Sequence, residues 1–103
     1  ARIPMNAIIE VPDGYALLLV PRSSTPEKKG LLSPHGIGII DQDFCGEKDE
    51  IHLLVLNFTD REVTVLRGER IAQAMFVKID KADFLEVIAP MSSSSRGGFG
   101  STG

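Results

Sequence analysis

The chain has 103 residues, a formal net charge of −3 and one cysteine, Cys45, which suits a single small domain and excludes an internal disulfide. Its acidic balance argues against a general binder of nucleic acid or of membrane surfaces, because those partners require a basic face. No apolar run approaches the ~20 residues that span a bilayer and no signal peptide is visible, so a cytoplasmic protein is expected, in keeping with a lone cysteine in a reducing compartment.

Short strands dominate the predicted secondary structure, because apolar and polar residues alternate with a period of two and helical periodicity is nearly absent. In chain order, strands are expected over residues 6–11, 15–20, 51–58, 61–66, 71–79 and 85–89. The other expected elements are a loop over 21–30, a hairpin over 31–40 with its bend at 33–36, and one helical turn over 80–83. Many short strands separated by turns predict an all-β sandwich or barrel.

The C-terminal residues 91–103 differ in composition from the β-domain expected over residues 1–90. Residues 96–103 place one aromatic ring, one cation and two hydroxyl groups among four glycines. Glycines leave backbone N–H groups accessible, arginine offers a planar fork of donors to phosphate, and a ring can stack on a base. This composition indicates a flexible Gly/Ser-rich lid for a nucleotide polyphosphate. An ordinary disordered tail is the alternative.

Asp41 is a candidate catalytic residue because it follows an apolar segment, Gly36 to Ile40, at an expected strand end. Partial desolvation there would favour the neutral acid and make the carboxylate a better proton acceptor near neutral pH. Phe44, three residues later, could form the floor of a pocket. The alternative is that Asp41 and Asp43 only stabilise a turn.

Arg22, Ser23 and Ser24 stand where an expected buried strand passes into a loop. Strand ends leave backbone N–H groups unpaired, and a guanidinium with hydroxyl groups beside them makes an anion site. Residues 68–73 are also compatible with a plain hairpin corner that leaves Gln73 facing solvent.

Four segments, in this order, resemble the second to fifth motifs of the trimeric dUTP diphosphatases (dUTPases). They are PRSS at 21–24, GIIDQDFCGE at 38–47, GERIAQ at 68–73 and RGGFGSTG at 96–103. The resemblance extends from about Ile3 to the C-terminus. It implies an all-β, jelly-roll-like subunit in a homotrimer, with active sites shared between subunits at their junctions.

The resemblance also implies an activity, the hydrolysis of dUTP to dUMP and pyrophosphate with Mg²⁺. Asp41 would be the catalytic residue, orienting and deprotonating the water that attacks the α-phosphate and contacting the sugar 3′-hydroxyl. The implied substrate-binding residues are Arg22, Ser23, Ser24 and Gln73 at the phosphates, His35, Gly36, Gly38, Ile39 and Ile40 around uracil, Phe44 beneath the deoxyribose, and Arg96, Phe99, Gly100 and Ser101 in the lid. The implied partners are dUTP and further copies of the same chain, with neither nucleic acid nor membrane.

No metal site built by protein side chains is expected. His35 and His52 lie too far from Cys45 in the sequence for zinc-ligand spacing. Mg²⁺ would instead bind mainly through the substrate phosphates, where it neutralises the triphosphate and positions it for in-line attack.

The chain departs from the family pattern in four places. The first motif, Gly/Ala-x-Asp-Leu, is missing, so an N-terminally incomplete domain is expected. Phe44 stands where many relatives carry Tyr, and His35 replaces a frequent Asn in the uracil hairpin. Arg96 precedes Phe99 by three residues instead of the usual five, which weakens its assignment to the γ-phosphate.

Two alternative functions stay open. The related dCTP deaminases need a catalytic glutamate three residues before the asparagine of the following strand. Here Leu54 holds that position before Asn57, and an apolar side chain cannot shuttle protons. A non-catalytic nucleotide-binding or regulatory trimer is compatible with the missing first motif, whereas Asp41 and the complete tail favour an enzyme.

Overall fold

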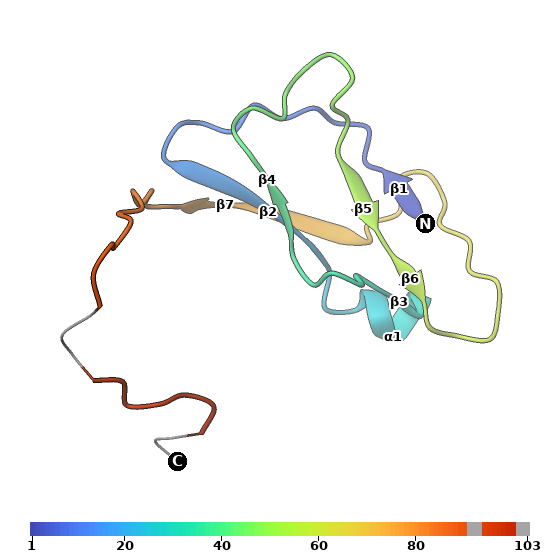
Figure 1. The fold of residues 1–103 in the computed structure, drawn as a ribbon. Helices are drawn as coiled ribbons and strands as arrows, with labels where there is room; N and C mark the ends of the chain where they lie inside the picture. Colours follow the sequence, from blue (N-terminus) through green and yellow to red (C-terminus); the bar gives the residue numbers. More distant parts are fainter. Residues whose placement is uncertain (91–93, 101–103) are drawn as a thin grey trace.

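The computed structural model describes residues 1–90 and 94–100, and in these residues the expected all-β class is confirmed. The elements are β1 (Arg2–Pro4), β2 (Tyr15–Pro21), α1 (Thr25–Lys29), β3 (Leu31–Leu32), β4 (Gly38–Ile40), β5 (His52–Leu54), β6 (Leu56–Asn57) and β7 (Ala72–Lys78) (Figure 1).

Strand β2 is the centre of the largest sheet, in which the strands follow the order β4-β2-β7 and pair antiparallel. Its sequence, YALLLVP, is mostly aliphatic, and Ala16, Leu17 and Leu19 are buried. Strand β7 pairs along its whole length, from Tyr15 opposite Lys78 to the far end of β2. Two smaller antiparallel sheets pair β1 with β5 and β3 with β6.

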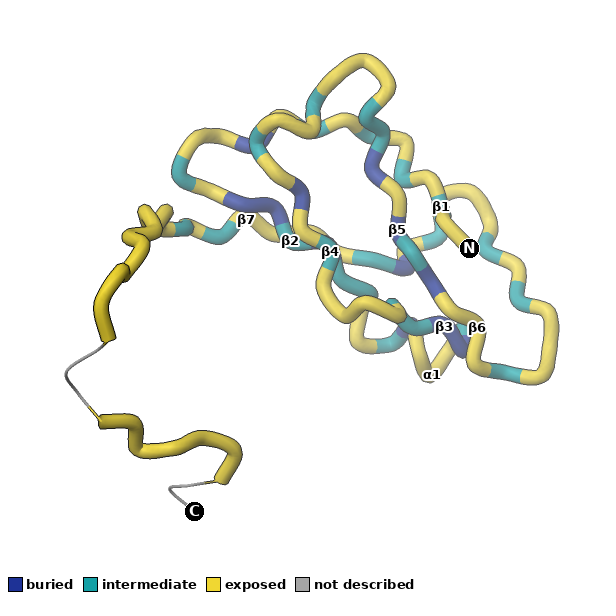
Figure 2. Tube along the Cα trace, viewed as in Figure 1, coloured by how far each residue is buried: buried dark blue, intermediate teal, exposed yellow. Residues whose placement is uncertain are grey.

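The core consists of aliphatic side chains from segments that are far apart in the sequence (Figure 2). Leu17 and Leu53, each 2% exposed, are its largest fully buried side chains. Full burial of such a side chain contributes about 1.5–3 kcal/mol to the free energy of unfolding. The buried members are Val11, Leu17, Leu19, Leu31, Ile40, Ile51, Leu53, Val55 and Ile71.

The short helix α1 lies inside the segment expected to be a loop, residues 21–30. Pro26 stands in its first turn, where a missing N–H costs little, and Gly30 ends it in the left-handed conformation at φ 67°. The Thr25 hydroxyl donates a 2.6 Å hydrogen bond to the Ile71 carbonyl and so holds α1 beside β7. Five residues are too few to show helical periodicity. No helix within the described ranges is long and apolar enough to cross a membrane.

The hairpin expected over residues 31–40 is wrong. Strands β3 and β4 flank the bend, but β3 pairs with β6 and β4 pairs with β2. The bend itself is present, because the Gly36 N–H donates to the Ser33 carbonyl at 3.2 Å and Gly36 has φ 81°. It therefore connects two sheets, which local turn chemistry cannot distinguish from a hairpin.

Other expected elements are absent or divided. Residues 6–11, 61–66 and 85–89 form no strand, residues 80–83 form no helical turn, and residues 51–58 divide at Val55 into β5 and β6. Val63 and Val65 nevertheless pack against the core, as their alternation suggests. Alternation thus reports which side chains are buried, and it does not say whether the backbone finds a hydrogen-bonded partner.

Lys29 and Glu69 connect α1 to the turn before β7. Lys29 Nζ lies 2.7 Å from Glu69 Oε2 and also donates to the Thr64 carbonyl at 2.9 Å. The hydrogen bond from Lys29, assisted by the Leu66 N–H, lowers the pKa of the Glu69 carboxyl below its usual value.

Removing this carboxylate should change how stability depends on pH. Because folding lowers the pKa of Glu69, the pair stabilises the fold above the unfolded pKa of roughly 4.3, and this contribution is lost as the pH falls through the folded value. We expect Glu69→Gln to lower the urea midpoint at about pH 7 and to have little effect at about pH 3. The exposed Glu47→Gln variant is the control, and an effect of Glu69→Gln that is equal at both pH values would contradict this account.

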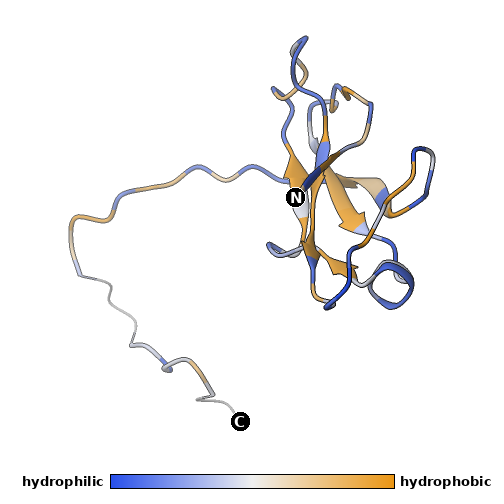
Figure 3. Ribbon diagram, turned by 90° about the vertical axis from the view of Figure 1, so that its right-hand side faces the viewer, coloured by the Kyte–Doolittle hydropathy of each residue, from blue (hydrophilic) through white to orange (hydrophobic). Residues whose placement is uncertain are grey.

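Residues 80–90, which follow β7, extend away from the body of the molecule (Figure 3). All of them are exposed. We call residues 80–90 the arm. Phe84, Leu85 and Ile88 in the arm are 101%, 89% and 96% exposed. Exposed apolar side chains that follow one another in this way are typical of an interaction surface.

Candidate functional site

One cavity gathers six of the residues expected at the site. It is bordered by β4 and β5 and has a volume of about 300 Å³. The expected residues that line it are His35, Gly38, Ile39, Ile40, Asp41 and Phe44. Gly36 lies in the bend that leads to β4 and is not part of the lining.

Each of the two bordering strands has an unpaired edge. Strand β4 pairs with β2 and strand β5 pairs with β1, and neither has a second partner in the part of the chain that the structure describes (Figure 1). Backbone N–H and C=O groups that lose water need another hydrogen-bond partner. The cavity therefore offers backbone donors and acceptors to a flat, polar ligand.

Gly38 leaves the wall of the cavity without a side chain. A Cβ at this position would lie 3.2 Å from the Leu19 carbonyl oxygen and 3.9 Å from His35 Nε2. The Ser33 hydroxyl oxygen lies 3.0 Å from His35 Nδ1, which engages one ring nitrogen. The other ring nitrogen, Nε2, is left at the cavity wall beside Gly38.

Asp41 and Phe44 lie on one turn directly after β4. The Phe44 N–H donates to the Asp41 carbonyl at 3.4 Å, and both residues line the cavity. The partial desolvation expected for Asp41 is wrong for the single chain, because the turn carries this residue past the buried end of β4 and leaves it exposed. Phe44 is 41% exposed and so presents part of its ring to a ligand.

Arg22, Ser23 and Ser24 lie at the far end of β2, next to the start of β7. The register places Val20 of β2 opposite Gln73 of β7, so the second and third resembling segments are neighbours in space. Arg22 and Gln73 are exposed, as an anion site at a strand end requires. The structure thus brings these four expected phosphate ligands into one region.

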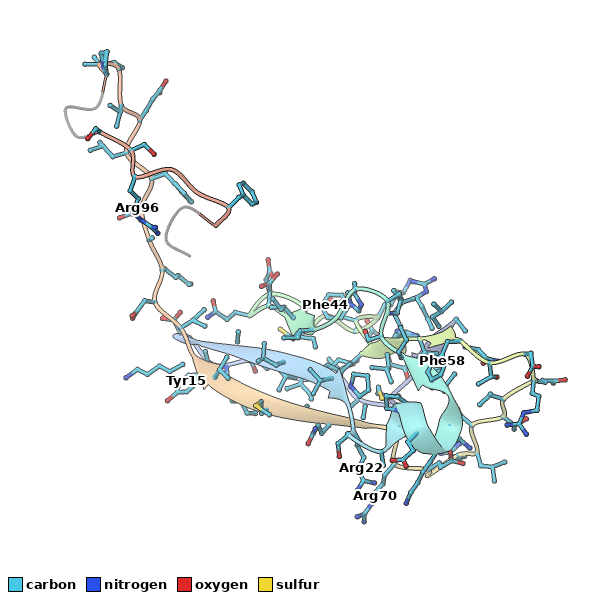
Figure 4. The ribbon with its side chains drawn as sticks, turned by 90° about the horizontal axis from the view of Figure 1, so that it is seen from below. Tyr15, Arg22, Phe44, Phe58, Arg70 and Arg96 are labelled. Atoms are coloured by element: carbon cyan, nitrogen blue, oxygen red, sulfur yellow. The ribbon has the colours of Figure 1, made fainter. Side chains whose placement is uncertain are left out.

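Arg70 belongs to the same region, although it is not among the site residues expected from the sequence. Arg22 Nη1 lies 3.4 Å from the Arg70 carbonyl oxygen, and the two side chains project from the same surface (Figure 4). Neither guanidinium has an ion pair within residues 1–90 and 94–100. Two neighbouring guanidinium groups repel each other, and an anion between them relieves the repulsion and accepts their hydrogen bonds.

The cavity and this arginine group stand near opposite ends of β2. Ile40, which precedes Asp41, pairs with Leu17, whereas Arg22 follows the last residue of the strand. About five residues separate Leu17 from Arg22, or roughly 17 Å at ~3.3 Å per residue. A single chain therefore does not bring Arg22 beside Asp41.

Among the described residues, the expected lid residues Arg96, Phe99 and Gly100 do not line the cavity. Arg96, Phe99 and Gly100 are exposed, and Phe99 is 114% exposed. Gly97 and Gly100 have φ values of 87° and 94°, so the segment does use the backbone freedom expected of its glycines. Ser101 lies outside the described residues.

Sequence reasoning missed seven residues of the cavity lining, which come from β1, β2, β5 and the segment just before β5. They are Arg2, Leu19, Glu50, Ile51, His52, Leu53 and Leu54. His52 Nδ1 donates to the Glu50 carbonyl at 2.9 Å, which makes Nε2 the acceptor of the neutral ring. For Glu50, His52 and Leu54 the one signal in the sequence is their period of two, which puts these three side chains on one face of a strand.

No group of three or more His, Cys, Asp or Glu side chains in the described ranges could hold a metal ion. The site chemistry therefore consists of a carboxylate and a ring in one cavity, a free backbone edge, and a separate group of cations.

A family model described as dUTPase matches residues 1–103 of this chain. A deoxyuridine 5'-triphosphate nucleotidohydrolase of Hydrogenobaculum sp. is 41% identical over 97 residues, which cover 92% of this chain and 65% of that protein. The chain thus spans just under two thirds of the length of this relative.

Two solved structures share the fold. The dUTPase from Streptococcus mutans superposes with a TM-score of 0.76 at 31% identity, over 82% of this chain and 68% of that one. The Staphylococcus bacteriophage 80alpha dUTPase with dUPNHPP superposes with a TM-score of 0.74 at 27% identity, over 100% of this chain and 75% of that one. These structures confirm the expected dUTPase-like, jelly-roll β fold.

Proposed function

This chain belongs to the dUTPase family, and from that premise we propose that it hydrolyses dUTP to dUMP and pyrophosphate. The observation that carries the proposal is the cavity in which Asp41, Phe44 and the free edge of β4 come together. A carboxylate can activate the water that attacks a phosphate, an aromatic ring can pack against the sugar, and a row of backbone groups can bind the base. The names of the relatives support dUTP as the substrate.

In the proposed reaction Asp41 is the general base. Its carboxylate accepts a proton from a water molecule as the water oxygen forms a bond to the α-phosphorus. The bond from this phosphorus to the oxygen that bridges to the β-phosphate breaks, and pyrophosphate leaves with the electron pair. The exposed position of Asp41 leaves room for this water between the carboxylate and the phosphate.

The base is proposed to bind along the free edge of β4. Uracil presents one ring N–H between two carbonyl oxygens, and a backbone edge can supply the complementary groups. Cytosine reverses the donor and acceptor at two of these positions, and each buried group left unpaired costs about 1–3 kcal/mol. The absence of a side chain at Gly38 permits the close approach that this recognition requires.

The discrimination against ribonucleotides is assigned to Phe44. A ring packed beneath the deoxyribose leaves little space for a 2′-hydroxyl, so we expect Phe44→Ala to raise kcat/KM for UTP relative to dUTP by about tenfold, equivalent to ~1.4 kcal/mol. Steady-state kinetics with both nucleotides measure the ratio, with Phe58→Ala, a half-exposed ring outside the cavity lining, as the control. An unchanged ratio would remove Phe44 from this role.

Mg²⁺ is proposed to arrive with dUTP as a complex with its phosphates. The phosphate oxygens of the substrate are hard ligands of the kind that Mg²⁺ prefers, which supports this role. When bound, the ion neutralises the triphosphate and favours in-line attack. Arg22, Ser23, Ser24, Arg70 and Gln73 are proposed to hold the phosphate chain through charge-assisted and neutral hydrogen bonds.

Sites shared between copies of the chain are proposed because one chain separates its two groups of site residues by about 17 Å along β2. A homotrimer would bring the arginine group of one subunit to the cavity of another and let the lid of a subunit reach a shared site. Exposed apolar surface supports such an assembly, since Met75 and Phe76 of β7 are 49% and 51% exposed and adjoin the apolar arm. We expect the chain to sediment as a trimer.

Pyrophosphate release by the purified chain in the presence of Mg²⁺ tests the activity. We expect dUTP to be hydrolysed at least about 100-fold faster than dCTP or UTP. Binding of dUTP without release of pyrophosphate would indicate the non-catalytic alternative. Ammonia release from dCTP would indicate a deaminase, although Leu54 presents an apolar side chain to the cavity at the position where that reaction needs an acid.

A further inference from the structure

A group of polar contacts joins the turn that carries Asp41 to the base of the arm. Gln42 Nε2 donates a 3.0 Å hydrogen bond to the Tyr15 carbonyl. Lys81 Nζ donates a 3.0 Å hydrogen bond to Gln42 Oε1 and lies 3.6 Å from Asp13 Oδ1. We call the contacts among Gln42, Tyr15, Lys81 and Asp13 the clasp.

Gln42 is the central residue of the clasp because the nitrogen and the oxygen of its side-chain amide each make a hydrogen bond. The nitrogen donates to the start of β2, and the oxygen accepts from Lys81 at the start of the arm. Neither an aliphatic side chain nor a carboxylate of the same length can make both bonds. Gln42 is also half-buried between the exposed Asp41 and Asp43, so its side chain packs inward where its neighbours face solvent.

Two backbone hydrogen bonds order the segments that the clasp connects. The Ile79 N–H donates to the Gly14 carbonyl at 2.9 Å, which holds the end of β7 and the exit of the arm against the turn before β2. The Phe44 N–H donates to the Asp41 carbonyl at 3.4 Å, which closes the turn after β4. The Gln42 side chain adds a direct contact between these two turns, beside the pairing of β2 with β4 and with β7.

Resting on the proposed function, we propose that Gln42 is a positioning residue, which holds the Asp41 turn in its catalytic orientation and links it to the direction in which the arm leaves at Lys81. The arm leads to the lid residues Arg96 and Phe99, so placement of the arm and orientation of the general base are coupled through one side chain. A displacement of about 1 Å at a reacting group can cost as much as ~100-fold in rate, so a contact that restrains this turn affects turnover.

The clasp lies at the surface. Its loss can therefore change turnover without a large change in the free energy of unfolding. The side chains of Lys81 and Asp13 are 66% and 95% exposed. Exposed ion pairs contribute little to the free energy of unfolding. Loss of the clasp should therefore leave the unfolding midpoint close to that of the wild type while it changes local mobility and kcat.

The test compares Gln42→Met, Lys81→Met and the double variant with the wild-type chain. Lys78→Met is the matched control, because Lys78 is an exposed lysine three residues before Lys81 with no side-chain hydrogen bond or ion pair in the described ranges. The first measurement is native-state amide hydrogen exchange without nucleotide. We expect exchange at Phe44 and Ile79 to be at least about threefold faster in Gln42→Met and Lys81→Met, and unchanged in Lys78→Met.

The second measurement is steady-state hydrolysis of dUTP. We expect kcat to fall about tenfold in Gln42→Met and somewhat less in Lys81→Met, with KM within about twofold of the wild type. The double variant should be no slower than Gln42→Met, because both substitutions break the same clasp. Rate losses that multiply in the double variant, or wild-type exchange and kcat in Gln42→Met, would overturn the inference.

The outcomes separate this inference from the proposed function. If the wild-type chain turns over dUTP and the Gln42→Met variant is fully active, only the positioning role is overturned. A wild-type chain without turnover overturns the proposed function, and the positioning role with it. If Gln42→Met fails to fold, Lys81→Met carries the same test, since its side chain is two-thirds exposed.

Discussion

The Asp41→Asn variant should bind dUTP as the wild type does and lose nearly all release of pyrophosphate. Asparagine has almost the shape of aspartate, but its amide cannot accept the proton of the attacking water. Loss of a general base lowers the rate by about 10²- to 10⁴-fold. Because Asp41 is exposed and lies outside the core, the substitution should leave folding unaffected.

Separate measurements of binding and turnover check this result. Calorimetric titration with a non-hydrolysable dUTP analogue reports affinity, and release of pyrophosphate reports catalysis. Asp43→Asn is a close control, because Asp43 is an exposed carboxylate two residues away that does not line the cavity. Turnover by Asp41→Asn within about tenfold of the wild type would exclude Asp41 as the general base.

Removal of residues 96–103 should greatly reduce catalysis while the fold and the assembly persist. The truncation removes the cation and the ring that are proposed to cover the terminal phosphates and the base. A lid that excludes water and completes the site is expected to contribute about 100-fold or more to turnover, in line with the stacking and charge-assisted contacts it would supply. The described residues of this segment are exposed and take no part in the core, so the unfolding midpoint should not change.

Sedimentation and kinetics of the truncated chain form a pair of measurements. We expect the truncated chain to sediment with the same trimer mass as the full chain and to hydrolyse dUTP much more slowly. Phe99→Ala tests the ring alone, and Phe58→Ala is the control, because Phe58 is a half-exposed ring outside the lid and the cavity lining. Normal turnover after truncation would show that the lid is not part of the site, whereas loss of the trimer would show that these residues serve assembly.

Some of the expected site residues come together because they are near in the sequence, and others only because distant strands pair. His35, Gly38, Asp41 and Phe44 are close together in the sequence, and a short strand with a turn at each end brings them into one cavity. Gln73 comes near Arg22 only because β7 pairs with β2, which no local pattern shows. The contributions of Arg2, Glu50 and His52 to the cavity were missed for the same reason.

The strand predictions were wrong for segments in which side chains pack against the core but the backbone does not pair as the pattern suggests. Residues 61–66 alternate as a strand does and partly bury Val63 and Val65, yet their backbone pairs with no strand among the described residues. The bend at 33–36 has the chemistry of a hairpin turn, but its two flanking strands enter different sheets. A period of two depends on side chains alone, whereas pairing depends on which edges the packed core brings together.

The amino-acid sequence by itself determined the all-β class, the order of the chemical groups along the chain and the family, because composition, periodicity and short motifs are local properties. Only the tertiary structure decided that a cavity opens between β4 and β5, that Arg22 and Asp41 stand near opposite ends of β2, and that Gln42 reaches both Tyr15 and Lys81. These facts depend on contacts between residues far apart in the chain. Such contacts are selected by the burial of the whole core, which no single segment specifies.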